Sequence, residues 1–162
     1  MPLVRIDVVE GRRSPEELRL LADTVQDVVL DVFAAPPGDR YQVITEHRPG
    51  QLICEDTGLG IERSDDLVVL QVFQQGRSDE QKRALYAGLS RRLGEVTSLA
   101  PGDLVVSVVA NPPADWSFGQ GRAQFLDGDL RSRARRVALS RSRPEGGNTC
   151  PHDTPSSSPG TS

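Results

Sequence analysis

The chain has 162 residues and 36% hydrophobic residues, enough for one domain with a buried core. Residues 1–130 hold 13 Lys and Arg against 21 Asp and Glu, a net charge of −8, which argues against nucleic acid as the main partner. No apolar run is long enough to cross a bilayer, and no signal-peptide pattern opens the chain, so we expect a cytoplasmic protein without a membrane partner.

Cysteine and histidine are sparse. Cys54 and Cys150 are too few for a disulfide framework, and His47 and His152 belong to no Cys/His cluster, so we expect no metal site. The sequence also lacks a Gly-rich phosphate loop after a strand and a Gly-x-Ser-x-Gly turn. The composition therefore leaves a cofactor-free chemistry, or none.

Pro2 follows the initiator Met1 and leads directly into a strand-like stretch, residues 3–9. A small second residue usually allows the Met to be trimmed, which here would leave a secondary amine as the first atom of the fold. Such an amine is a base when neutral and a localised positive charge when protonated, and it can also form an iminium with a carbonyl. An α-amino group titrates near ~8, so burial or one nearby carboxylate decides which form is present.

The elements that follow Pro2 form a strand-helix-strand unit. Residues 14–17, Ser-Pro-Glu-Glu, are typical of a helix start, with Ser as the N-cap and Glu three residues later. Apolar side chains then recur at helical spacing. A Pro-Gly-Asp corner at residues 37–39 leads into a second strand over 41–45. The apolar helix positions are Leu18, Leu21, Ala22, Val25, Val28 or Val29, and Val32.

The same unit occurs a second time at an offset of 64 residues. Residues 2–18 align without a gap onto residues 66–82, and the Pro-Gly-Asp corner recurs at residues 101–103. The copy predicts a strand over 67–73, a helix that begins at Ser78, and a strand over 104–109. The identical pairs include Leu3/Leu67, Val4/Val68, Val8/Val72, Arg13/Arg77, Ser14/Ser78 and Glu16/Glu80.

Two β-α-β units, at about 2–47 and 66–110, predict an α/β (α+β) domain over residues 2–130. Each crossover helix makes the strands of its unit parallel neighbours, so we expect a four-stranded, mainly parallel-paired sheet with two helices on one face. The strands are nearly continuous in apolar residues, so the uncovered face predicts self-association. Residues 131–162 carry six Arg among Ser, Pro and Gly, and we expect a basic, disordered tail.

A doubled β-α-β unit that starts at an N-terminal Pro resembles the tautomerase superfamily. Longer stretches are similar to the malonate semialdehyde decarboxylase family, and the similarity covers residues 2 to about 130. Those stretches are residues 39–42 (DRYQ), 47–50 (HRPG), 56–60 (DTGLG), 63–64 (RS), 77–82 (RSDEQK), 115–119 (DWSFG), 121–123 (GRA) and 125–126 (FL).

This resemblance implies a homotrimer that decarboxylates 3-oxopropanoate to acetaldehyde and CO2, in the bacterial breakdown of chlorinated alkenes, with no cofactor. By position it implies that Pro2, Asp39 and Arg77 are the catalytic residues. Asp39 would keep the Pro2 amine charged, and Arg77 would hold the substrate carboxylate. One position departs from the family pattern, because the chain has Gln75-Gly76-Arg77 where the family has Arg-Pro-Arg.

Other polar and aromatic residues are candidates for substrate contacts. An apolar wall beside the reacting carbonyl would strengthen both charge contacts and favour the departure of neutral CO2. Gln75 and Tyr41 can donate hydrogen bonds to substrate oxygens, whereas His47 is interpreted as a hydrogen-bonded structural residue. The candidates for the wall are Trp116, Phe118 and Phe125, each of which would also fit an ordinary core.

The sequence leaves several alternatives open. Pro2 begins one strand and Arg77 follows the end of its copy, so the two can meet if the copies run antiparallel about a pseudo-twofold axis. Asp39 and Arg77 have repeat partners, Asp103 and Arg13, so turn chemistry or helix-start pairing would also explain them. Three alternatives remain: a keto–enol tautomerase or a 3-haloacrylate dehalogenase/hydratase of the same superfamily, an imine route through Pro2, and a non-enzymatic trimeric interaction protein.

Overall fold

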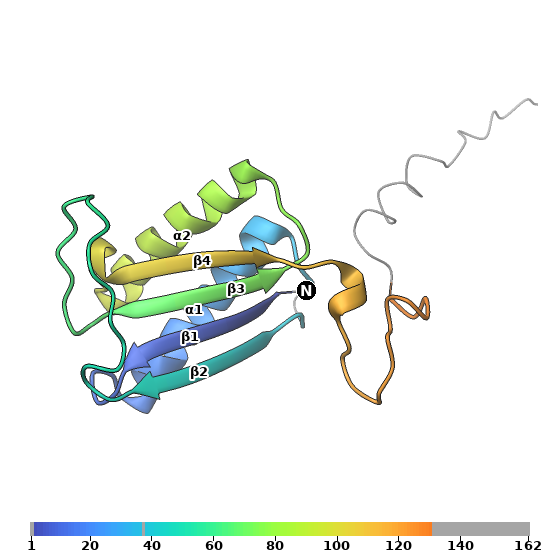
Figure 1. Ribbon diagram of the computed structural model, residues 1–162, viewed down its shortest axis with the longest axis horizontal. Helices are drawn as coiled ribbons and strands as arrows, with labels where there is room; N and C mark the ends of the chain where they lie inside the picture. The colour runs from blue at the N-terminus through green and yellow to red at the C-terminus, as the bar shows by residue number, and fades with distance from the viewer. Residues whose placement is uncertain (1, 37, 131–162) are drawn as a thin grey trace, which may run out of the picture.

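Two β-α-β units build the structure, which is a computed structural model that describes residues 2–36 and 38–130 (Figure 1). The predicted basic tail with Cys150 and His152, the initiator Met1, and Pro37 of the first corner lie outside the described residues. The elements are β1 (Leu3–Val9), α1 (Pro15–Phe33), β2 (Tyr41–His47), β3 (Val68–Gln74), α2 (Asp79–Thr97) and β4 (Leu104–Ala110), with 3-10 turns η1 (Pro101–Asp103) and η2 (Pro113–Asp115).

Both helices begin at the predicted capping boxes. The Ser14 hydroxyl accepts a hydrogen bond from the Glu17 N–H at 3.2 Å, and the Glu17 carboxylate accepts one from the Ser14 N–H at 2.8 Å. Ser78 and Gln81 make the same reciprocal pair at 3.2 Å each. Two of the N–H groups that a helix start leaves without intrahelical partners are thereby satisfied in each unit.

The four strands form one sheet in the order β2-β1-β3-β4. The strands within each unit are parallel, as predicted, and the two units meet through an antiparallel pairing of β1 with β3. In that pairing Leu3 lies opposite Phe73. β3 spans residues 68–74, one residue later than predicted, because its pairings with β1 and β4 extend over these residues. β2 and β4 are also slightly longer than predicted.

One face of the sheet packs against α1 and α2, which lie behind the strands in Figure 1. The predicted apolar stripes of both helices lie on this face, and Phe33 at the end of α1 joins them with no exposed surface. Alternate residues of β1 and β3 complete the core because successive side chains point to opposite faces of a strand. They are Val4, Ile6, Val8, Val68, Leu70 and Val72.

The other face of the sheet is covered by neither helix, as the sequence predicted, but it is less apolar than expected. Asp7 lies on this face, and its carboxylate is 2.8 Å from His47 Nε2 and 3.8 Å from the Arg5 guanidinium. His47 therefore has the hydrogen-bonded role that the sequence analysis gave it. Tyr41, Val43 and Val109 are exposed on the same face, at 39%, 48% and 39%.

The capping boxes give a test of the repeated architecture. We expect Ser14→Ala and Ser78→Ala each to lower the free energy of unfolding by about 1 kcal/mol, because each removes one side-chain cap. Urea denaturation measures the change. Ser90→Ala, inside α2, is the control and should leave stability unchanged or raise it, since Ala is the better helix former. Equal effects of all three substitutions would contradict the capping roles of Ser14 and Ser78.

Candidate active site

The antiparallel pairing of the two units brings four chain segments to one end of the sheet. β1 and β2 begin at this end, whereas β3 and β4 finish there. Pro2 therefore lies at the same end as the 75–77 segment that follows β3 and the 111–118 segment that follows β4. The sequence did not determine whether the two units run antiparallel. The pairing of β1 with β3 is antiparallel, so Pro2 and Arg77 lie at the same end of the sheet.

Pro2 is buried, and so is Asp39, whose exposed fraction is 5%. Asp39 stands two residues before β2, which starts beside β1 because Tyr41 pairs with Leu3. Its main chain is held twice: the Asp39 N–H donates to the Pro36 carbonyl at 3.0 Å, and the Gln26 side-chain amide donates to the Asp39 carbonyl at 3.0 Å. A buried carboxylate on a fixed backbone thus lies at the end of the sheet where the chain begins.

Arg77 is held by an aromatic ring that the sequence analysis did not single out. The centre of its guanidinium lies 4.7 Å from the centroid of the Phe33 ring, within the range of a cation–π contact. Phe33 is fully buried at the last position of α1, so the ring is a rigid support. This contact orients the guanidinium plane, which suits a group that binds a planar carboxylate.

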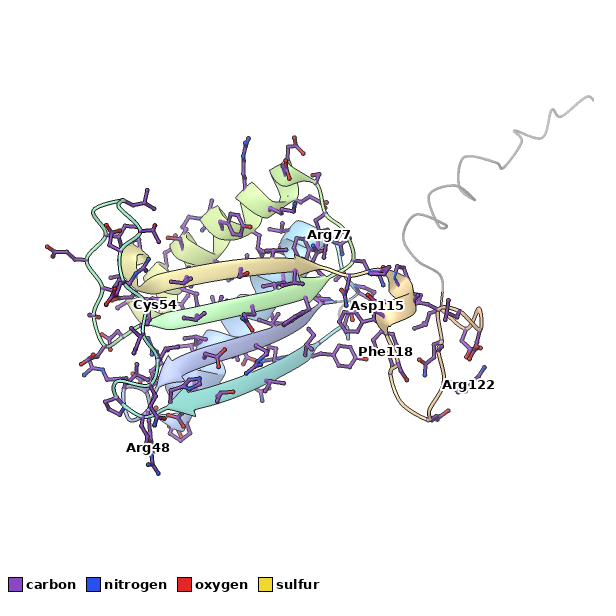
Figure 2. All side chains as sticks on the ribbon, in the orientation of Figure 1. Arg48, Cys54, Arg77, Asp115, Phe118 and Arg122 are labelled. Carbon is purple, nitrogen blue, oxygen red and sulfur yellow. The ribbon has the colours of Figure 1, made fainter. Side chains whose placement is uncertain are left out.

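The four aromatic residues predicted to contact substrate come together in one aromatic cluster. Phe118 is its centre, with ring centroids 5.6 Å from Tyr41, 5.6 Å from Trp116 and 5.9 Å from Phe125. The Trp116 and Phe118 rings are stacked at an angle of 11°. Figure 2 shows Phe118 and Asp115 at the same end of the sheet as Arg77, with Arg48 and Cys54 at the opposite end.

Asn111 ties this aromatic cluster to the sheet. Its backbone N–H donates to the Gln74 carbonyl at 3.0 Å. The Asn111 side-chain amide makes two hydrogen bonds when its oxygen and nitrogen positions are exchanged. Nδ2 then donates to the Gln74 carbonyl at 3.1 Å, and Oδ1 accepts from the Trp116 indole N–H at 3.1 Å. Nothing in the sequence marks Asn111, although it directly follows β4 as Gln75 follows β3.

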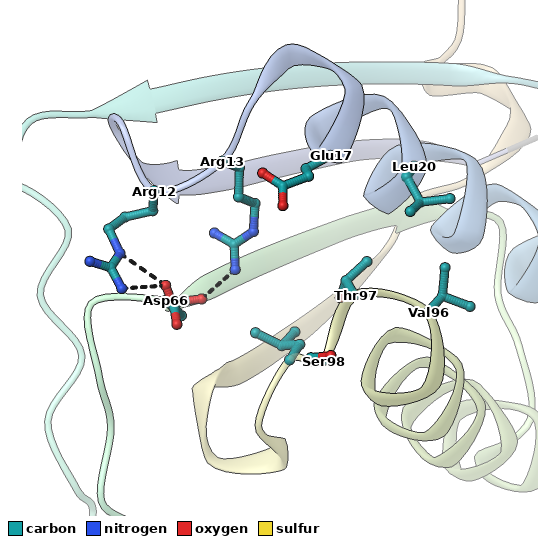
Figure 3. A pocket seen from close by; sticks show the side chains of 9 residues that line it. Arg12, Arg13, Glu17, Leu20, Asp66, Val96, Thr97 and Ser98 are labelled. Atoms are coloured by element: carbon teal, nitrogen blue, oxygen red, sulfur yellow. Dashed lines mark hydrogen bonds and ion pairs between the residues drawn. The ribbon is translucent and has the colours of Figure 1, made fainter.

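The opposite end of the sheet carries the repeat partners of these residues. By the offset of 64, Asp66 stands in the position of Pro2 and Arg13 in that of Arg77. Arg12 donates to the Asp66 carboxylate at 2.9 Å, and Arg13 donates to the Asp66 main-chain carbonyl at 2.6 Å (Figure 3). A pocket of about 340 Å³ lies beside them, lined also by Glu17, Leu20 and residues 96–99.

Both arginines at this second end interact with Asp66. Burial lowers the pKa of Arg13, and the nearby Asp66 carboxylate opposes that effect. The hydrogen bond from Arg12 to Asp66 raises the pKa of Arg12. Because both arginines are engaged by Asp66, this end does not repeat the arrangement at Pro2. Arg13 thus binds the segment that leads into β3, through the main-chain carbonyl of Asp66.

Asp103, the repeat partner of Asp39, belongs to the second Pro-Gly-Asp corner. The Asp103 carboxylate accepts hydrogen bonds from the Ser64 N–H at 2.6 Å and from the Ser64 hydroxyl at 2.7 Å. Asp103 therefore secures the connection that leads into β3.

Within residues 2–36 and 38–130, no group of three or more His, Cys, Asp and Glu side chains is arranged to hold a metal ion. No described helix is both long enough and apolar enough to cross a membrane.

Comparisons with known proteins agree with the architecture. Families described as "Tautomerase enzyme" match residues 39–119 and residues 2–61. The chain is 47% identical over 130 residues to "probable tautomerase YrdN" of Bacillus subtilis (strain 168), covering 80% of this chain and all of that protein. It is also 31% identical to "probable tautomerase YusQ" of the same organism, covering 78% of this chain and all of that protein.

Several solved structures share the architecture of this chain. Crystal structures of malonate semialdehyde decarboxylase superpose with a TM-score of 0.76 at 43% identity, covering 80% of this chain and 99% of theirs. A second such decarboxylase, inhibited by 3-bromopropiolate, gives 0.75 at 41% identity, covering 79% and 97%. A fused 4-OT described as a symmetric trimer shares the fold, with a TM-score of 0.62 at 18% identity, covering 78% and 98%.

The hydrogen bonds of Asp103 give a stability test. We expect Asp103→Ala to lower the free energy of unfolding by about 2 kcal/mol, because two hydrogen bonds to a buried carboxylate are lost. Ser64→Ala should cost less, since it keeps the backbone donor. Urea denaturation measures both, and an Asp103→Ala protein as stable as the parent would contradict the bracing role.

Proposed function

The chain belongs to the tautomerase family, and we propose that it decarboxylates 3-oxopropanoate to acetaldehyde and CO2. The observation that carries the proposal is the end of the sheet where Pro2, Asp39, Arg77 and the aromatic cluster gather. The similarity to malonate semialdehyde decarboxylases, at 43% and 41% identity over about four-fifths of the chain, supports this choice within the family.

The reaction needs no cofactor, because a 3-oxo acid carries its own electron acceptor. The bond between the carboxylate carbon and C2 breaks, and its electron pair moves towards the carbonyl to give an enolate and CO2. The enolate carbon then takes up a proton and becomes the methyl group of acetaldehyde. The protein has to stabilise the charge that develops on the carbonyl oxygen and hold the breaking bond in line with the carbonyl π system.

Pro2 and Arg77 divide these two tasks. After Met1 is trimmed, the protonated Pro2 amine donates a hydrogen bond to the carbonyl oxygen and stabilises its developing charge. Arg77, oriented by Phe33, binds the substrate carboxylate through paired N–H donors. Gln75 stands where the decarboxylase family has a second arginine, so it contributes a neutral amide in place of a charge.

In this proposal Asp39 has the task of keeping Pro2 in its charged form. The Asp39 carboxylate raises the pKa of a nearby amine and so keeps Pro2 protonated near neutral pH. The rate should therefore fall as the pH rises through the pKa of Pro2, since the proton that stabilises the enolate is lost. Trp116, Phe118 and Phe125 form the apolar wall beside the reacting carbonyl, and Tyr41 is a hydrogen-bond donor to the substrate.

Assembly into a homotrimer forms part of the same proposal. Neither helix covers the second face of the sheet, and its exposed valines, Val43 and Val109, favour burial against another copy. The fused 4-OT described as a symmetric trimer has this fold, which supports the same assembly here.

A keto–enol tautomerase is the second candidate, favoured by the 47% identity to a probable tautomerase and by the neutral Gln75. The two reactions need opposite protonation states of Pro2. Tautomerisation uses the neutral amine as a base near pH 7, whereas decarboxylation uses the ammonium. A pKa of Pro2 well below 7 would therefore favour the tautomerase.

The repeat offers a matched pair of variants to test Arg77. Mixed with the parent protein, 3-oxopropanoate should give acetaldehyde in proton NMR spectra. We expect Arg77→Ala to slow this production roughly 10²- to 10³-fold, because the carboxylate loses its charged partner. Arg13→Ala, the same change at the opposite end of the sheet, should leave the rate near that of the parent.

The comparison is made on folded protein at 25 °C, with circular dichroism spectra recorded for each variant. Normal acetaldehyde production by Arg77→Ala would refute the role of Arg77. If the parent protein produces no acetaldehyde but interconverts the keto and enol forms of a 2-oxo acid, the tautomerase replaces the decarboxylase.

A further inference from the structure

Gln74 is a buried amide for which the described chain supplies no hydrogen-bond partner. It is the last residue of β3, its exposed fraction is 0%, and neither Nε2 nor Oε1 has a partner among the described residues. An enclosed amide that makes no hydrogen bond destabilises a fold, whereas an apolar side chain of similar size would not. Such a group in a native structure calls for an explanation.

The rest of Gln74 is firmly held. Its carbonyl accepts from the Asn111 N–H at 3.0 Å, and its main chain pairs with Ala110 of β4. Its side chain lies on the helix side of the sheet, because it continues the alternation of Leu70 and Val72, which are core residues. The amide therefore lies in a site where the described residues supply it with no hydrogen-bond partner.

The register of the sheet identifies a candidate partner for the Gln74 amide. Leu3 is the partner of Phe73, so the next positions along the two strands are Pro2 and Gln74. Both side chains are buried. Trimming Met1 would convert the Pro2 nitrogen from an amide into an amine, which carries two N–H donors when protonated. In a buried place, both donors need acceptors.

We propose that Gln74 is a positioning residue whose Oε1 accepts one of these two N–H groups, while Asp39 supports the other. This inference rests on the proposed role of Pro2 as an ammonium. The arrangement explains why a buried amide is kept at a position where leucine would fit better. It leaves Nε2 to donate to an oxygen of the bound oxo acid.

Several charged groups share this end of the sheet. Asp39 and Arg40 precede β2, Arg77 follows β3, and Asp115 follows β4. Arg40 is paired with Asp23 at 2.6 Å, so its charge is partly balanced. Arg77 lowers the pKa of a nearby amine and Asp39 raises it, and a hydrogen bond that Gln74 accepts adds to the effect of Asp39.

The test is the pKa of the Pro2 amine, followed by ¹⁵N NMR of proline-labelled, trimmed protein without substrate. Gln74→Leu should lower that pKa by about one pH unit, because a hydrogen bond to the charged form is lost. Gln74→Glu should raise it, since a carboxylate supports the ammonium more strongly. The thermal unfolding temperature of Gln74→Leu should stay unchanged or rise.

Gln71→Leu is the matched control, because Gln71 lies on the same strand with its side chain on the face opposite to the core. Its Pro2 pKa should equal that of the parent. If folded Gln74→Leu and Gln74→Glu both keep the parent's pKa, the role of Gln74 is wrong. If the parent makes no acetaldehyde while Gln74→Leu still lowers the pKa, the role of Gln74 stands and the decarboxylase proposal fails.

Discussion

The antiparallel pairing of β1 with β3 is the constraint on which the candidate site depends. Because Leu3 lies opposite Phe73, the start of the chain is fixed beside the end of β3, and the residues after β3 reach the same end of the sheet. A parallel pairing would have sent Pro2 and Arg77 to opposite ends, about 20 Å apart for strands of this length. The strand register therefore positions Pro2, a task that a loop performs in many other sites.

Duplication produced two similar ends, and the chain uses them differently. At one end Asp66 binds both arginines, Arg12 through its carboxylate and Arg13 through its main-chain carbonyl. At the other end the residue in the position of Asp66 is Pro2, which brings no carboxylate to Arg77. The guanidinium of Arg77 is supported instead by the face of Phe33.

Local features were predictable from sequence, and long-range partners were not. The capping boxes at Ser14 and Ser78 depend on residues three apart, so both helix starts were predicted correctly. Tyr41, Trp116, Phe118 and Phe125 were each expected near the substrate, but nothing in the sequence showed that they form one cluster. Phe33, Asn111 and Gln74 were missed for the same reason: the significance of each depends on a partner that only the sheet brings near.

The central claim is that the chain starts with a charged proline amine at the end of the sheet that carries Arg77. The most direct measurement is a titration of the parent protein, ¹⁵N-labelled at proline, followed by NMR alongside its intact mass. The account predicts that Met1 is absent and that the Pro2 nitrogen titrates above pH 7, so that the ammonium prevails at neutral pH. Active protein that retains Met1, or a Pro2 amine that is neutral at pH 7, would contradict it.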